Sequence, residues 1–298
     1  LDRTTALQLA GNWREAGVAW AISGLGATIP RDGEARAGLI DLSLPQWPAD
    51  WALGYWAVGA IGRRLAIAQS ALDGGYDNVY AFRRGVEAAG GRIVADRITH
   101  AVPGRPGDAR VLAGLLRTRP DAVFAGVSGA EGGDFLRLWR RVAAGTGCPL
   151  LATGQLGGPA HRGAVPEGTC TAVTWDAALP DAGNAAFVAR HRERYGHEPH
   201  PLAAAGYLAA AITAGIAEYG RIADALAWLR AADIAMPITD PGFDPATGTL
   251  TAAPWLRRFE GGRSVPVAPI PGPASARMRR DPIAARPRSG LGQPYLGA

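Results

Sequence analysis

The sequence contains no lysine and only two cysteines, and the small number of cysteines excludes a structural zinc site made of cysteines alone. All 31 strongly basic residues are arginines, which we attribute to genomic base composition rather than to chemistry. Cys148 and Cys170 fit no zinc-site spacing, because a structural zinc ion needs four ligands. In an oxidising compartment the two could form one disulfide; otherwise we expect small buried side chains.

A strongly apolar run long enough to cross a membrane is also absent. The longest candidate, residues 201–217, is mostly alanine and glycine and ends before Glu218, whereas a membrane span needs about 20 strongly apolar residues. We interpret this segment as a buried helix and expect no membrane span in this chain. The N-terminus shows no signal-peptide pattern, but the chain begins with Leu1 rather than methionine, so this absence is uninformative.

The net charge of +5 comes mainly from one short segment. Residues 277–288 hold five arginines and Asp281, and the remainder of the chain carries a net charge of only +1. A nearly neutral body does not favour nucleic acid as a partner. Residues 271–298, rich in arginine and proline, are expected to form a tail that wraps the surface or is disordered.

Residues 64–94 contain the most informative pattern in the sequence. A short apolar run at 65–69 precedes a polar, glycine-bearing loop at 70–77, and apolar residues at helical spacing follow over 79–89, before a second apolar run begins at 92. Strand, loop, helix and strand in this order form the unit from which parallel sheets are built. The loop after each strand faces the ligand crevice of such a sheet, and Tyr76 lies on this loop.

Similar patterns along the chain predict an α/β protein with two lobes, which its 298 residues can accommodate. Helices at 184–231 follow the second βα block without enough strands for a domain of their own, so the chain must cross between lobes more than once, which implies a hinge. The other expected strands are 18–23, 37–42, 122–125, 150–152, 171–175, 255–259 and 265–267. The last two are expected to form a closing hairpin, and FDPATG (243–248) has the sequence of a hairpin turn. The other expected helices are 5–13, 47–61, 108–117, 134–144, 184–195, 203–219 and 222–231.

Several segments resemble type I periplasmic binding proteins, the leucine/isoleucine/valine-binding family of ABC transporter receptors. The resemblance rests on the order and spacing of five pieces: ISGLGATIP (22–30), RRLAIAQSALDGGYDNVYAFRRGVEAAGG (63–91), PDAVFAGVSGAEGGDFLRLW (120–139), PLLATGQ (149–155) and FDPATG (243–248). It implies two lobes, each a parallel sheet flanked by helices, that close around a ligand by hinge motion. We expect lobe I at 1–61 and 178–250, and lobe II at 62–177 and 251–270.

The first lobe is expected to be incomplete. Members of this family begin with a strand–helix–strand–helix–strand segment that the sequence lacks. The serine-rich loop that usually binds the carboxylate of an amino acid belongs to that segment and is missing as well. The resemblance further implies an extracytoplasmic receptor without cofactor, metal or catalytic activity, which delivers an amino acid or related carboxylate or amide to an ABC transporter permease.

Position by position, the resemblance implies ligand-binding roles for residues of both lobes. Ala27 and Thr28 would contribute from the first lobe, with Thr28 and the preceding backbone offering hydrogen bonds to a carboxylate. From the second lobe, Tyr76 would cover the ligand with its ring, and Ser128 and Gln155 would supply hydrogen bonds.

The residue at position 155 weakens the case for a free amino acid. Amino-acid binders of the family can carry an acid there, which pairs with the ligand's ammonium, whereas Gln155 supplies no charge. Charge-assisted hydrogen bonds are roughly twice as strong as neutral ones. An amide, a carboxylate without an amine, or an aromatic acid is therefore also a candidate ligand.

Two other functions compete with this one. The segment around Ser128, GVSGA, approaches the nucleophile-elbow pattern of α/β hydrolases but ends in alanine. Partners for such a serine would come from Asp176, Asp181, His191, His197 and His200. A ligand-sensing regulatory module of the same fold is the other alternative, which the sequence cannot separate from a transport receptor.

Two further motifs do not support a metal or nucleotide site. The spacing of His197 and His200 is one residue short of a zinc motif, and Pro199 opposes the helix such a motif needs. The glycine pairs at 74–75 and 132–133 do not fit the dinucleotide fingerprint.

Overall fold

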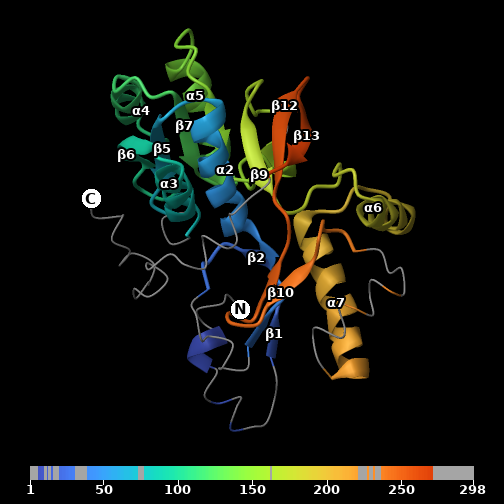
Figure 1. Ribbon diagram of the computed structural model, residues 1–298. Coiled ribbons are helices and arrows are strands. Elements are labelled where there is room, and N and C mark those ends of the chain that lie inside the picture. Colours follow the sequence, from blue (N-terminus) through green and yellow to red (C-terminus); the bar gives the residue numbers. More distant parts are fainter. Residues whose placement is uncertain are drawn as a thin grey trace. The chain divides into compact units, whose positions relative to one another are not determined.

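The computed structural model describes residues 6–9, 12, 15, 20–30, 39–72, 77–161, 163–220, 227, 231 and 236–270. The chain divides into two compact units, between which it passes after Gln46, after Val173 and after Pro254. Unit 1 takes its described residues from Leu1–Gln46 and Thr174–Pro254, and unit 2 takes most of its own from Trp47–Val173 and Trp255–Met278. Figure 1 shows the chain coloured along the sequence.

Unit 2 is built on a seven-stranded sheet in the order β13-β12-β9-β8-β7-β5-β6. Its parallel part consists of β5 (Arg64–Ser70), β6 (Arg92–His100), β7 (Ala122–Gly126), β8 (Leu150–Ala152) and β9 (Cys170–Val173). The strands β12 (Trp255–Glu260) and β13 (Arg263–Pro269) form an antiparallel hairpin that pairs with β9. The expected parallel sheet and its closing hairpin are therefore both present.

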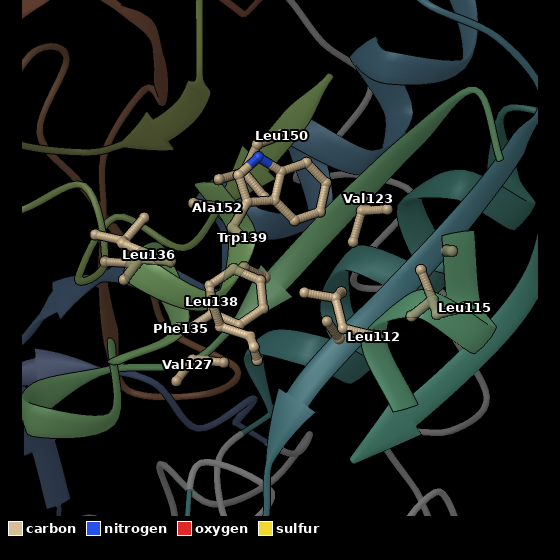
Figure 2. Packing of buried hydrophobic residues seen from close by; sticks show 14 of the residues in the cluster. Leu112, Leu115, Val123, Val127, Phe135, Leu136, Leu138, Trp139, Leu150 and Ala152 are labelled. Atoms are coloured by element: carbon tan, nitrogen blue, oxygen red, sulfur yellow. The ribbon is translucent and has the colours of Figure 1, made fainter. Parts of the chain in front are cut away.

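Connections between the parallel strands place the helices of unit 2 on two faces of the sheet. The helix α3 (Asn78–Ala88) leads outward from β5 to the edge strand β6, whereas α4 (Ala109–Leu116) and α5 (Gly129–Val142) lead back across β5 to β7 and on to β8. Because such crossovers are right-handed, α3 lies on one face and α4 with α5 on the other. Apolar residues of α4 and α5 share one core with β7 and β8, and Figure 2 shows Leu112, Leu115, Val123, Phe135, Leu138, Trp139 and Leu150 packed together.

The helix α2 (Gln46–Ala60) packs against α3 at very close range. A Cβ atom built on Gly54 would lie 2.3 Å from the Phe82 carbonyl oxygen, and one built on Gly85 would lie 2.0 Å from that of Trp51. Two glycines thus let the two backbones touch. The sequence interpretation placed residues 47–60 in the first lobe, whereas these contacts join them to unit 2.

Unit 1 contains a four-stranded sheet in the order β1-β3-β11-β10. The strands β1 (Trp20–Ile22), β3 (Leu39–Asp41) and β11 (Thr249–Thr251) are parallel, and β10 (Gly242–Asp244) forms an antiparallel hairpin with β11. The expected turn at 243–248 is therefore confirmed. Two shorter strands, β2 (Leu25–Gly26) and β4 (Leu44–Pro45), pair in parallel.

Two helices cover the core of unit 1. In α6 (Ala182–Tyr195), Asn184 is fully buried, accepts a hydrogen bond from Trp175 Nε1 at 2.9 Å and donates to the Asp176 carbonyl at 2.9 Å. In α7 (Pro201–Tyr219), Ala204, Leu208 and Ile212 are buried and the opposite face is exposed, so the expected buried helix is buried on one side only. Among described helices, α7 alone is long and apolar enough to span a membrane, a test that helices of soluble cores also pass.

Some expected element boundaries were wrong, and several expectations fall on undescribed residues. The helix α5 begins at Gly129 rather than at residue 134, and β6 extends to His100 rather than ending near residue 94. Residues 6–9 and 12 of the first expected helix are helical, as is residue 15 beyond its expected end. Most of the expected helix at 222–231, and all of the tail at 271–298, lie outside the described residues.

A substitution within α2 tests the close packing of α2 on α3. Gly54→Ala should lower the free energy of unfolding by about 1–3 kcal/mol, because the added methyl group overlaps the Phe82 backbone. Gly59→Ala on the same helix meets nothing within 4 Å, so it should be neutral or gain up to about 1 kcal/mol from higher helix propensity. Urea unfolding measures both, and equal effects would contradict the packing.

The buried carboxyl group of Asp50 on α2 predicts a pH dependence. Asp50 is 1% exposed, its Oδ1 atom has no hydrogen-bond partner in the described part of the chain, and burial raises its pKa well above the ordinary value. As the pH rises above about 4, the unfolded chain loses this proton while the folded chain keeps it. Wild-type stability should therefore fall relative to that of Asp50→Asn, with a gap on the order of 1–3 kcal/mol near neutral pH.

Urea unfolding at about pH 4 and about pH 7 measures this gap. A difference between wild type and variant that stays constant between the two pH values would contradict the buried, protonated state of Asp50.

Candidate functional site

The carboxyl ends of β5, β7 and β8 form one edge of the sheet in unit 2. These three strands are parallel, with β7 paired to β5 on one side and to β8 on the other. The loops that follow them therefore emerge together, at the edge where α/β proteins bind ligands. Ser128 follows β7 and Gln155 follows β8, so the structure places these two expected site residues at the same edge, whereas Tyr76 lies outside the described residues.

Ser128 is the N-cap residue of α5. Its backbone is extended, its carbonyl accepts a hydrogen bond from the Gly132 N–H at 2.9 Å, and its side chain makes no capping hydrogen bond. The helix begins here despite three glycines among its first five residues, because tertiary contacts hold its first turn. A Cβ atom on Gly132 would lie 2.9 Å from His161 Nε2 and 2.8 Å from Leu156 Cδ1, so a larger residue would displace these side chains.

Gln155 is held in a tight turn after β8. Thr153 is buried, and its Oγ1 atom accepts a hydrogen bond from the Leu156 N–H at 3.2 Å. The Gln155 carbonyl accepts another from the Gly158 N–H at 3.0 Å. The backbone on both sides of Gln155 is therefore fixed, and its half-buried side chain starts from a defined position.

Next to Ser128, a buried acid occupies the first turn of α5. Glu131 is 7% exposed, and neither of its carboxylate oxygens has a hydrogen-bond partner in the described part of the chain. Packed against the same turn, His161 has a lowered pKa because burial disfavours its charged form, an effect that a hydrogen bond with the Gly129 backbone partly offsets. The sequence analysis did not single out Glu131, although Ser-x-x-Glu at a helix start could have drawn attention to it.

In unit 1, Ala27 and Thr28 directly follow β2. Ala27 is 6% exposed and its N–H donates to the Leu25 carbonyl at 2.9 Å, so this backbone donor is already used within the loop. Thr28 is half-buried. Both residues lie at a strand end, as expected. Because the Ala27 N–H already donates to the Leu25 carbonyl, the Thr28 hydroxyl is the better candidate to hydrogen-bond with a ligand.

The residues considered for a hydrolase are engaged in local structure within unit 1. Asp181 caps α6 by accepting from the Asn184 N–H, and His200 caps α7 by accepting from the Leu202 N–H. The Nδ1 atoms of His191 and His197 lie within hydrogen-bond distance of the backbone carbonyls of His197 and Glu198. Asp181 and the three histidines therefore each make a local structural contact.

A hydroxyl–imidazole–carboxylate array does occur in unit 2, but its hydroxyl and imidazole groups are buried. His100 Nδ1 lies 3.1 Å from Thr99 Oγ1, and its Nε2 atom lies 3.2 Å from Asp134 Oδ2. The pKa of Asp134 is lowered, mainly by the hydrogen bond from the Gly107 N–H. Thr99 and His100 are each 1% exposed, so this array anchors the 101–108 loop rather than meeting a substrate.

The structure shows no disulfide between Cys148 and Cys170, which are both free. Burial raises the pKa of both thiols, that of Cys148 to about 11. Within the described residues, no group of three or more histidine, cysteine, aspartate or glutamate side chains could hold a metal ion.

Comparisons with known proteins agree on one family and one fold. A family model described as periplasmic binding protein matches residues 45–263. Among solved structures, a solute-binding protein of an ABC transporter from R. palustris, in complex with benzoate, is 24% identical, with a TM-score of 0.65 over 89% of this chain and 74% of that one. A search of curated proteins finds no match.

Two further structures show the same fold. A solute-binding protein from Rhodopseudomonas palustris BisB5, in complex with 3,4-dihydroxybenzoic acid, is 20% identical, with a TM-score of 0.66 over 89% of this chain and 76% of that one. An ABC transporter substrate-binding protein from Desulfitobacterium hafniense, in complex with Leu, is 20% identical, with a TM-score of 0.63 over 88% and 77%.

The turn that presents Gln155 can be tested through Thr153. Thr153→Val keeps the shape of the side chain but removes the acceptor for the Leu156 N–H, which should cost about 1–3 kcal/mol of folding free energy. Thr153→Ser keeps the hydroxyl and should recover most of that loss. Urea unfolding of the three proteins measures the effect, and a valine variant as stable as the wild type would contradict it.

Proposed function

The chain belongs to the periplasmic binding protein family, and on this premise we propose that it is the extracytoplasmic solute-binding receptor of an ABC transporter. The family match over residues 45–263 is the observation that carries the proposal. The fold supports it, since solved proteins of similar fold are described as solute-binding or substrate-binding proteins of ABC transporters. The partner implied is the transporter's permease.

For the ligand, we propose an amino acid or a related small carboxylate. The three solved proteins compared above are described as complexes with benzoate, 3,4-dihydroxybenzoic acid and Leu, and each of these molecules carries a carboxylate. In this chain, the strand-end loops of unit 2 present a hydroxyl on Ser128 and an amide on Gln155. These neutral groups can hydrogen-bond to a polar ligand without requiring it to be charged.

The proposed binding mode uses both units. Ser128 and Gln155 would supply hydrogen bonds from unit 2, Thr28 would supply one from unit 1, and Tyr76 would cover the ligand with an aromatic ring. A ligand that contacts both units at once favours the closed state, because only that state makes all the contacts. Three chain passages between the units, counted within the described residues, make hinge motion the natural means of closure.

We also propose that the protein binds without catalysis and needs no cofactor. Support comes from the local roles of the candidate histidines and aspartates, which cap helices or contact neighbouring backbone. A binding protein must release its solute unchanged, and the residues of the proposed site are hydrogen-bonding and apolar groups suited to that task.

Thermal unfolding with a ligand panel tests the function. A true ligand at about 100 times its Kd should add about 2.7 kcal/mol to the free energy of unfolding and raise the Tm. The panel contains leucine, valine, benzoate and 3,4-dihydroxybenzoate, with glucose as an uncharged control. Stabilisation by glucose alone, or by none of the carboxylates, would contradict the proposal.

Gln155→Ala tests the site with the ligand that the panel identifies. The variant should bind about 2- to 10-fold more weakly, the value of one neutral hydrogen bond, and its stability without ligand should stay close to that of the wild type. Gln8→Ala, at an exposed helical position in unit 1, is the matched control and should bind like the wild type. Isothermal titration calorimetry measures both.

A further inference from the structure

Glu131 is a buried acid whose carboxylate has no hydrogen-bond partner in the described part of the chain. It lies in the first turn of α5, directly after β7, and is 7% exposed. Both of its carboxylate oxygens are buried, and neither has a hydrogen-bond partner in the part of the chain that the structure describes. A buried polar group without a partner is costly, and for a charged group the cost is higher.

Helix capping does not explain Glu131. The spacing of Ser128 and Glu131 fits a capping box, in which the glutamate accepts from the backbone N–H of the N-cap residue and the serine accepts from that of the glutamate. Here the Ser128 side chain makes no capping hydrogen bond, and the Glu131 oxygens are unpartnered. Neither half of the box is formed.

Glu131 lies at the start of α5, at the ligand edge of the sheet. Cα–Cβ bonds in a helix tilt toward its N-terminus, and the N-terminus of α5 lies where β7 ends, between the ends of β5 and β8. Glu131 lies one turn before Phe135, on the buried side of the helix. Both of its carboxylate oxygens are therefore buried near the edge that carries Ser128 and Gln155.

The neighbouring helix start shows the same surplus of acceptors. Asn78 is the first residue of α3, which follows β5, the strand next to β7. It is 7% exposed, and its Oδ1 atom is buried without a hydrogen-bond partner within the described residues. The helix starts that follow two adjacent strands thus hold buried acceptor oxygens for which a donor is needed.

We propose that Glu131 binds the hydrogen-bond donor group of the ligand, an ammonium or a hydroxyl. An ionised carboxylate can only accept hydrogen bonds, so its partner must bring an N–H or an O–H group. The inference rests on the proposed function and deepens it: the ligand is a small carboxylate that also carries a donor group. Glu131 would supply from the first turn of α5 the charge that Gln155 does not.

Pairs of ligands that differ only in the donor group test this assignment. Leucine is compared with 4-methylpentanoate, which lacks the amine, and 3,4-dihydroxybenzoate is compared with benzoate. Isothermal titration calorimetry on the full chain gives the affinity of wild type and Glu131→Gln for each. For at least one pair, the wild type should prefer the donor-bearing ligand, and the variant should lose about 10-fold or more in affinity for that ligand alone.

The pair that responds identifies the donor as ammonium or hydroxyl. Glu167→Gln makes the same change at an exposed glutamate of unit 2 and should keep the wild-type preference. Glu131→Gln should also unfold at the same or a higher urea concentration than the wild type, because it replaces an acid that has no hydrogen-bond partner among the described residues with a neutral amide. A structural role for the carboxylate would lower that concentration.

Two results would overturn the inference in distinguishable ways. If the wild type binds none of the four ligands, the proposed function fails and the inference fails with it. If the wild type binds, but Glu131→Gln keeps the same ratio of affinities within each pair, the proposed function stands and the role of Glu131 is refuted.

Discussion

Parallel pairing of β5, β7 and β8 is the constraint on which the rest of unit 2 depends. Parallel neighbours all end at the same edge, and right-handed crossovers then fix which face each connecting helix covers. The turn at Gln155, the start of α5 at Ser128 and the buried carboxylate of Glu131 all occur at this edge for that one reason. The apolar core between α4, α5, β7 and β8 holds the edge in place.

Most of the fold could be predicted from the sequence, because apolar runs and glycine-bearing turns mark the strands directly. The prediction matches β8 residue for residue and finds both terminal hairpins. Errors arose where tertiary contacts decide. The glycine-rich start of α5 has poor helix propensity but is held by His161 and Leu156. The polar second half of β6 does not look like a strand, yet it pairs with β5 along its whole length.

The site was harder to predict than the fold. Strand ends can be located from the sequence, so Ser128 and Gln155 could be expected to follow strands, and the structure places them at neighbouring strand ends. Burial of a single acid within a polar-looking helix start cannot be seen in this way, since Glu131 has the identity of an ordinary solvated first-turn residue. Only the structure shows that its carboxylate is buried without a hydrogen-bond partner among the described residues, as it also shows that the Asp50 carboxyl group is buried.

The passages of the chain between the units after Val173 and after Pro254 also govern the order in which the protein can fold during synthesis. Val173, in β9, pairs with Trp255, in β12, across about 80 residues of intervening sequence that belong to unit 1. A ribosome releasing the chain from its N-terminus therefore cannot complete the sheet of unit 2 until nearly all of unit 1 has emerged. Unit 2 thus cannot finish folding before nearly all of unit 1 has been synthesised. Until β12 is available, one edge of β9 remains unpaired and can form non-native strand pairs.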